Sequence, residues 1–206
     1  MPAPRTLAAP FFLALSAFAL FAMPAHADLG DTSASGVASA AKRTAPRLAS
    51  GLFSPMPGGH LAGYAADTGL DIAGFRLPVF ALAAGTLDYA EEGHTRWNGR
   101  GDSRLALRLA LDEPIAVPGA SRRVTHVWYA HLTSVEIAQA EGALPRAHVE
   151  GGQVLGVSGF ANGAPHLHLG MLLDGDVSQD AGTFLGEDEI RVVLGRLSAR
   201  GRLARR

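Results

Sequence analysis

The chain has 206 residues, of which 48% are hydrophobic, and this length suits one domain with a sizeable core and flanking segments. It contains no cysteine, so it is neither a lipidated bacterial lipoprotein nor a disulfide scaffold, and its stability must come from an apolar core or a metal. Its 18 basic and 19 acidic residues leave a formal net charge of −1. The domain body lacks a basic patch with interleaved aromatics, so nucleic acid is not an expected partner.

Residues 1–27 have the pattern of a secretory signal peptide. A single early charge at Arg5 precedes an apolar run over 11–23, and the small-residue sequence Ala25-His26-Ala27 follows Pro24. The apolar run of about 13 residues is shorter than the roughly 20 that a bilayer span needs. We therefore expect cleavage after Ala27 rather than a transmembrane anchor, and export of the mature protein to the periplasm or to the medium.

The rest of the chain predicts a mainly β domain over 51–186. Residues 28–50 are rich in Ala, Ser, Thr and Gly with little periodicity, which indicates a linker or a short helix. The strict alternation over 104–111 places leucines on one face and Arg or Ala on the other, and predicts the clearest strand. Further strands are expected at 77–82, 86–90, 124–132 and 153–158, and one short helix at 134–140. The expected fold class is an antiparallel β-sheet or sandwich with few short helices.

Residues 187–206 form an arginine-rich C-terminal tail with six arginines: Arg191, Arg196, Arg200, Arg202, Arg205 and Arg206. Two interpretations are open for this segment. The tail could contact an anionic surface. Alternatively it is a solvated or frayed amphipathic helix with Ile190, Val193, Leu194 and Leu197 on one side, and this second interpretation is favoured because charged terminal runs are usually solvated.

The most informative motif is His166-Leu167-His168, preceded by the turn Gly163-Ala164-Pro165. Side chains alternate between the faces of a strand, so the two histidines point to the same side and can serve one metal or one substrate. On the strand at 124–132, alternation puts Val127, Tyr129 and His131 on one face, which makes a third imidazole available beside the pair. The same rule predicts that His126 faces the other way.

Two carboxylates precede the first apolar strand of the domain. Asp67 and Asp71 lie four residues apart around Gly69, at a transition from loop to strand. Carboxylates in that setting can coordinate a divalent cation.

Together with these residues, several separated motifs occur in a defined order along the chain: Asp71-Ile72-Ala73, Pro78-Val79, Ala83-Ala84-Gly85, Tyr129-Ala130-His131-Leu132, Gly152-Gln153-Val154-Leu155-Gly156-Val157-Ser158-Gly159 and Pro165-His166-Leu167-His168. In this order they resemble the landmarks of the lysostaphin-like zinc metallopeptidases, also called the LytM domain. The resemblance covers roughly residues 52–185. It implies a mainly β domain, a single Zn²⁺ in a groove, and hydrolysis of peptide cross-bridges or stems in bacterial peptidoglycan.

The resemblance also implies roles for individual residues. Asp71 and His168 take the positions of metal ligands, while His131 and His166 take those of the catalytic residues, and which imidazole is the general base stays open. Where the family has a histidine four residues before the aspartate, this chain has Asp67. A carboxylate binds zinc at nearly the same distance as an imidazole, so Asp67, Asp71 and His168 remain a three-ligand set with an open fourth position.

A second carboxylate adds negative charge, which should make a bound metal a weaker Lewis acid and its bound water less acidic. An aspartate is also shorter than a histidine, so its oxygen could fall short of the metal. His60, which follows Pro57-Gly58-Gly59, is an alternative ligand, although an ordinary loop histidine needs no special geometry.

Two functions are therefore in view. The first is an exported zinc metalloendopeptidase that acts on peptidoglycan peptides. The second is a catalytically degenerate, metal-free LytM-like module that binds and regulates another cell-wall hydrolase, and the substitution at Asp67 motivates it.

Overall fold

The computed structural model describes residues 44–62, 68–95, 99–180 and 182–195. The predicted signal peptide, the proposed ligand Asp67 and the arginines from Arg196 onward lie outside these ranges. Within the described ranges, no helix combines the length and the hydrophobicity that a bilayer span requires.

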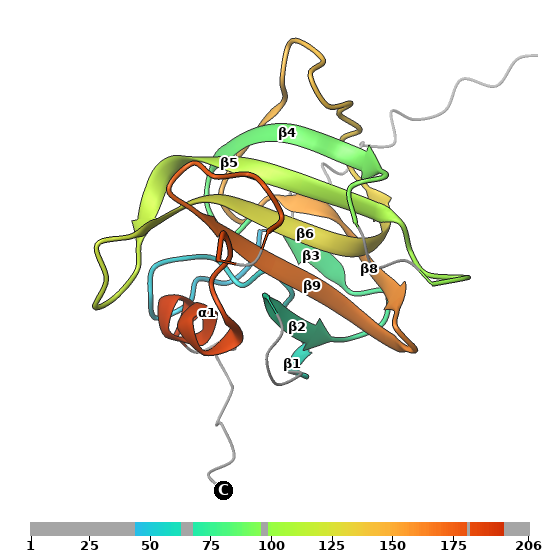
Figure 1. Cartoon of the computed structure of the whole chain (residues 1–206). Helices are drawn as coiled ribbons and strands as arrows, with labels where there is room; N and C mark the ends of the chain where they lie inside the picture. The colour runs from blue at the N-terminus through green and yellow to red at the C-terminus, as the bar shows by residue number, and fades with distance from the viewer. Residues whose placement is uncertain (1–43, 63–67, 96–98, 181, 196–206) are drawn as a thin grey trace, which may run out of the picture. The chain divides into compact units, whose positions relative to one another are not determined.

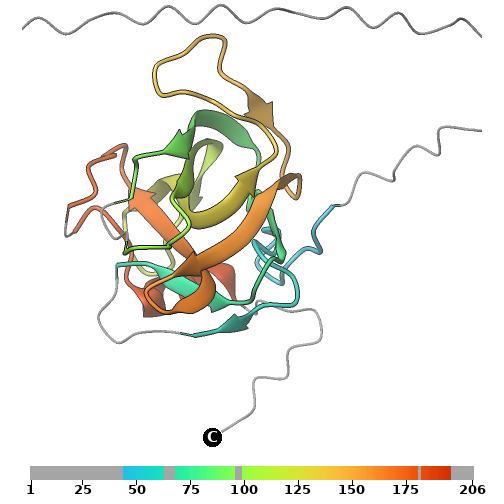
Figure 2. The ribbon, with the colours of Figure 1, turned by 90° about the vertical axis from the view of Figure 1, so that its right-hand side faces the viewer.

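Antiparallel strands form nearly all of the regular secondary structure in the described ranges (Figure 1), which confirms the mainly β expectation. The strands are β1 (His60–Leu61), β2 (Leu70–Ala73), β3 (Pro78–Phe80), β4 (Gly85–Glu92), β5 (Leu105–Ala116), β6 (Arg123–Val135), β7 (His148–Val149), β8 (Val154–Ala161) and β9 (Ala164–Leu173). Their order in the sheet is β1-β2-β9-β8-β6-β5-β4-β7; β3 pairs with β8, and β9 also pairs with β6. Figure 2 shows that the sheet is strongly curved.

The strands predicted from alternation are all present, with shifted ends, but the helix expected at 134–140 is wrong. β6 continues to Val135, and Ser134 and Val135 pair with Val157 and Gly156 of β8. Gly156 has no side chain where the carbonyl of Ser134 approaches, so the two backbones come close enough to pair. The following residues run irregularly until Gln139 forms an isolated bridge with Ala90. Pairing with a distant strand has overridden the local helical preference.

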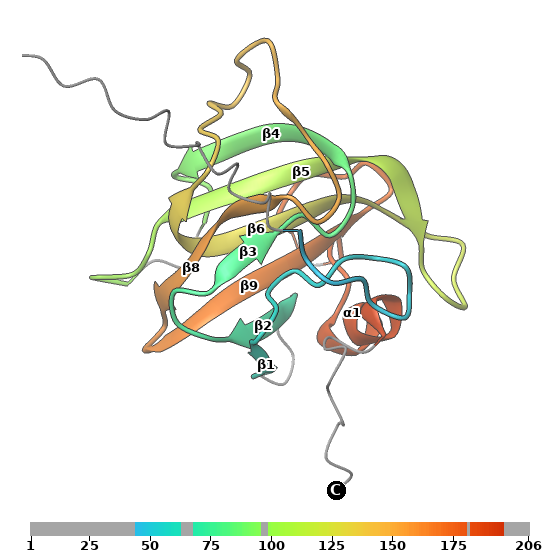
Figure 3. The same cartoon turned by 180° about the vertical axis from the view of Figure 1, so that it is seen from behind.

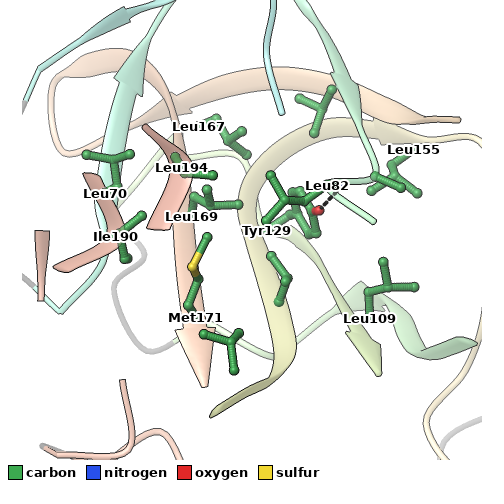
Figure 4. Close-up of a cluster of buried hydrophobic side chains, with 14 of the residues drawn as sticks. Leu70, Leu82, Leu109, Tyr129, Leu155, Leu167, Leu169, Met171, Ile190 and Leu194 are labelled. Atoms are coloured by element: carbon green, nitrogen blue, oxygen red, sulfur yellow. Dashed lines mark hydrogen bonds between the residues drawn. The ribbon is translucent and has the colours of Figure 1, made fainter. Parts of the chain in front are cut away.

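One face of the curved sheet covers the hydrophobic core (Figure 4). Leu167, Leu169 and Met171 alternate along β9 and are fully buried on this face, as the alternation of side chains along a strand predicts. The hydroxyl of Tyr129 accepts a 2.8 Å hydrogen bond from the backbone N–H of Leu82, so this phenol is satisfied inside the core.

The core is closed by a short helix and by the segment before β1. Figure 3, which views the molecule from behind, shows the segment 44–56, in blue, and β3 facing the viewer. The helix α1 (Glu187–Leu194) buries Ile190, Val193 and Leu194, which agrees with the amphipathic pattern expected for the start of the tail. Ala45 and Leu48, expected in the linker, are buried, and the N–H of Ala45 donates to the carbonyl of Gly152. These residues therefore pack on the domain.

The opposite face of the sheet carries the histidine pair. Because side chains alternate, His166 and His168 lie on the face away from Leu167 and Leu169. A smaller buried cluster occupies this second face: Tyr89, Ala106, Trp128, Ala130, Leu172 and Phe184. We call this surface of β4, β5, β6 and β9 the histidine face.

Candidate functional site

His131 reaches the histidine face through a β-bulge, which corrects the prediction from simple alternation. Val127 and Tyr129 do share a face, but it is the core face. The ring of His131 lies instead 5.0 Å from that of His166 and 6.2 Å from that of His168, between ring centroids. The structure thus brings the third imidazole to the pair, but on the opposite face of β6 from Val127 and Tyr129.

The pairing of β5 with β6 explains this change of phase. Leu107 is opposite Tyr129 whereas Leu105 is opposite Leu132, so β6 has one residue more than β5 between these pairs. His131 adopts a φ of 62°, in the left-handed region that non-glycine residues rarely adopt. Bulges re-aim side chains in this way and are common beside functional sites. The cost of a left-handed residue, about 1–2 kcal/mol, is tolerated here by the surrounding pairing.

The prediction that His126 and His131 face opposite ways is also wrong. The bulge puts His126 on the same face as His131, but it lies farther along the strand, opposite Leu172. Its Nε2 is 3.7 Å from a carboxylate oxygen of Asp88, which Arg108 also contacts. Burial lowers the pKa of His126 against the opposing influence of Asp88. His126 therefore belongs to a separate polar cluster.

Asp71 and His168 form the most direct contact of the site. They are paired residues of β2 and β9, and Nδ1 of His168 lies 2.9 Å from Oδ1 of Asp71. The other ring nitrogen, Nε2, lies 3.2 Å from the carbonyl oxygen of Thr68. A carbonyl can only accept, so this contact places a proton on Nε2. The Nδ1 lone pair then faces the carboxylate, an arrangement that requires a proton or a metal cation between the two atoms.

The tautomer of His166 is fixed in the opposite sense. Its Nδ1 donates to the carbonyl of Ala164 over 3.0 Å, which leaves Nε2 with its lone pair. That Nε2 is 3.7 Å from Oδ1 of Asp71, the same oxygen that contacts His168. His166 is only 4% exposed. It therefore presents a proton-accepting nitrogen to the oxygen around which the site is built.

His131 is buried to 3% exposure, and its Nδ1 has no hydrogen-bond partner among the described residues. Burial, together with the nearby His166 and His168, lowers the pKa of His131 to about 4, against smaller opposing effects of the Ser103 backbone and Asp71. The imidazole is consequently neutral at neutral pH and has one nitrogen available to a ligand.

The donors that face one another suit a zinc ion. Zinc bonds of 2.0–2.1 Å in a tetrahedron put ligand atoms roughly 3.3 Å apart. The two proposed ligand atoms in the described ranges, Oδ1 of Asp71 and Nδ1 of His168, lie 2.9 Å apart, close to that value. Carboxylate oxygen and imidazole nitrogen are both ordinary zinc donors.

In the part of the chain that the structure describes, no group of three His, Cys, Asp or Glu residues is arranged to hold a metal. Asp71 and His168 supply two donors, and the predicted third, Asp67, lies outside that part. The alternative ligand His60 is exposed on β1, opposite Ala73, and is not among the described contacts of Asp71 or His168. The described residues therefore include two of the three predicted ligands.

Three features of the site have no clear signal in the sequence. The carbonyl of Thr68 is a backbone group, so the residue type at this position does not predict its contact with His168. Trp128 lies beside His168 because β6 and β9 pair with Trp128 opposite Gly170, and the two ring centroids are 5.4 Å apart. Ser103 contacts His131 only because its N–H and hydroxyl bind the backbone of Phe160, far away in the sequence.

No family profile and no curated protein matches the sequence. Among solved structures, the chain is similar to the catalytic domain of lysostaphin from Staphylococcus simulans, with 23% identity, a TM-score of 0.38, and 58% of this chain and 74% of that domain covered. For full-length lysostaphin the identity is 21%, the TM-score 0.44, and the coverage 73% of this chain. For a mutant catalytic domain of the prophage-encoded M23 protein EnpA from Enterococcus faecalis these values are 19%, 0.40 and 70%, with 95% of that domain covered.

The matched region spans about half of the full-length lysostaphin chain, 53%. These structures are similar to this chain, but likeness at this level carries no argument about activity. The functional case rests on the residues of the site.

Proposed function

We propose that the chain is an exported zinc metalloendopeptidase that hydrolyses peptide bonds in bacterial peptidoglycan. The observation that carries the proposal is the convergence of His131 of β6 and of His166 and His168 of β9 on the buried carboxylate of Asp71 in β2. The ordered motifs that resemble lysostaphin-like peptidases supply the substrate class. Export would bring the enzyme to the cell wall, in the periplasm or outside the cell.

In this proposal Asp71 and His168 hold the zinc ion, with Asp67 as the third ligand. Zinc, when bound, polarises a carbonyl and makes a water more acidic. The carbonyl of Thr68 keeps the proton of His168 on Nε2, so that the lone pair of Nδ1 can act as a ligand.

The two remaining histidines divide the proton chemistry. Nε2 of His166 carries a lone pair because Nδ1–H is bound to Ala164, so His166 acts as the general base that accepts a proton from water. Neutral His131, whose Nδ1 has no partner in the described part of the chain, donates an N–H to the oxyanion that develops on the scissile carbonyl. The tautomer of His166 supports this choice of the general base, which the sequence left open.

The second candidate is a metal-free LytM-like module that binds another cell-wall hydrolase and regulates it. Asp67 at the histidine position of the resemblance, together with only two donors in the described ranges, favours this alternative. A module of this kind needs no general base, so it gives no role to the lone pair on Nε2 of His166.

The test is digestion of purified peptidoglycan by the exported protein, with added zinc, followed by analysis of the released amines. The wild-type protein should release new peptide amines, and His166→Ala should abolish the release while the protein stays folded. His148→Ala is a matched control, because His148 is an exposed histidine bound to Asp112 on another part of the sheet. Digestion that is absent in the wild-type protein, or equal in wild type and His166→Ala, would contradict the proposal.

A further inference from the structure

Trp128 packs directly against the imidazole of His168. The two rings meet edge to face, with centroids 5.4 Å apart and an interplanar angle of 69°. Trp128 also contacts Phe184, and their ring centroids are 5.9 Å apart. Trp128 is 5% exposed, so the indole is fixed in place by packing.

The indole occupies space that β9 leaves open beside His168. Gly170, the next residue of β9 on the histidine face, is paired with Trp128. A Cβ at Gly170 would lie 2.8 Å from a ring carbon of Phe184 and 3.2 Å from a ring carbon of Trp128. Phe184 is held there by its bridge to Leu172. The absence of a side chain at Gly170 thus makes room for the rings of Phe184 and Trp128, and Trp128 contacts the imidazole.

His168 is confined from the β2 side as well. β9 pairs with β2 along one edge and with β6 along the other, so the imidazole lies between these two neighbours. On the β2 side, a Cβ at Gly69 would lie only 2.6 Å from Nε2 of His168, which shows how closely the backbone approaches the ring. On the β6 side His168 is paired with Ala130, and the ring of Trp128 contacts its imidazole.

The two hydrogen-bond acceptors of His168 lie at opposite nitrogens, Asp71 at Nδ1 and Thr68 at Nε2. A ring turned by 180° about its Cβ–Cγ bond would move both nitrogens away from these oxygens. Hydrogen bonds in the metal-free protein resist such a turn, and a rigid ring packed on one side resists it further. The outer neighbours of metal-binding histidines set ring orientation in this way.

We infer that Trp128 is a positioning residue, whose indole holds the imidazole of His168 in the orientation that directs Nδ1 to Asp71. Its consequence for zinc affinity rests on the proposed function. The orientation itself is a property of the metal-free protein and can be measured without zinc.

The test compares Trp128→Ala and Trp128→Phe with Leu172→Ala. Leu172 is 1% exposed and belongs to the same buried cluster, but it makes no ring contact with His168, so its truncation controls for general loss of packing. The first measurement is the imidazole nitrogen and carbon NMR spectrum of His168 in metal-free protein. The second is zinc affinity, from competition with a chelator.

For Trp128→Ala we expect a second population of His168 ring signals and a Kd for zinc raised by about 10–100-fold. Trp128→Phe, which keeps an aromatic ring at the site, should restore most of the affinity. Leu172→Ala should keep a single set of His168 signals and a Kd within about threefold of wild type, since lost packing alone leaves the ligand shell intact. If Trp128→Ala does not fold, the comparison of Trp128→Phe with Trp128→Leu replaces it, and only the leucine variant should show the second population.

Unchanged His168 signals in the tryptophan variants, or a loss of zinc affinity in Leu172→Ala as large as in Trp128→Ala, would overturn the inference. Failure of the wild-type protein to bind zinc would contradict the proposed function instead. The NMR comparison would still decide the role of Trp128 in that case.

Discussion

The left-handed backbone of His131 makes a sharp prediction about substitutions at this position. In an ordinary strand, glycine in place of alanine costs roughly 0.5–1 kcal/mol, because glycine loses more backbone entropy on folding. At a φ of 62° the order should reverse, since alanine retains the left-handed cost of about 1–2 kcal/mol and glycine does not. We therefore expect His131→Gly to be more stable than His131→Ala, by about 1 kcal/mol after the entropy of glycine is subtracted.

Both variants remove the buried imidazole, so their comparison cancels its packing and its unpartnered Nδ1. Ala130→Gly is the matched control, because Ala130 is the adjacent buried residue and is not left-handed. Urea unfolding, analysed with the same dependence of free energy on urea concentration for every protein, gives the difference in the free energy of unfolding between each of the three variants and the wild type. Ala130→Gly should lose roughly 0.5–1 kcal/mol. If His131→Gly is less stable than His131→Ala by that same amount, the bulge does not strain His131, and the explanation of how it reaches the site fails.

Two further predictions concern stability. Tyr129→Phe removes the acceptor of the buried Leu82 N–H and should lower the free energy of unfolding by about 1–3 kcal/mol in urea, whereas an unchanged midpoint would mean that the bond is not needed. The pKa of His131 is depressed from 6.5 to about 4, so the unfolded metal-free chain binds more protons between these values, and stability should be fully present above pH 6.5 and fall as the pH drops towards 4. The loss is of the order of 3 kcal/mol at most. Urea titrations at several pH values give the free energy of unfolding as a function of pH, and this dependence should differ between wild type and His131→Gly only within that window.

The periodicity of the sequence predicts much of the fold, because alternation depends only on which face of a strand is buried. The leucines of 104–111 and the histidines of 166–168 both have the predicted phase. The error at 134–140 arises from a pairing with β8 that no local pattern contains.

The site is predictable only in part for the same reason. The pair His166 and His168 needs one strand and one rule, and the sequence suffices. His131 needs a bulge whose position depends on the register between β5 and β6, and the indole of Trp128 reaches His168 through the register between β6 and β9. A carbonyl such as that of Thr68, which fixes a tautomer, has no side-chain signature at all.

The most direct test of the account is calorimetric titration of zinc into the metal-free wild-type protein and into Asp71→Asn, with His148→Ala as control. The account predicts one zinc ion per chain in the wild type and in His148→Ala. In Asp71→Asn the affinity should fall by more than the roughly 10–100-fold that loss of an outer-shell partner produces, because a ligand atom is lost. A wild-type protein that binds no zinc, or an Asp71→Asn variant that binds it as tightly as wild type, would contradict the central claim that this histidine and aspartate cluster is a metal site.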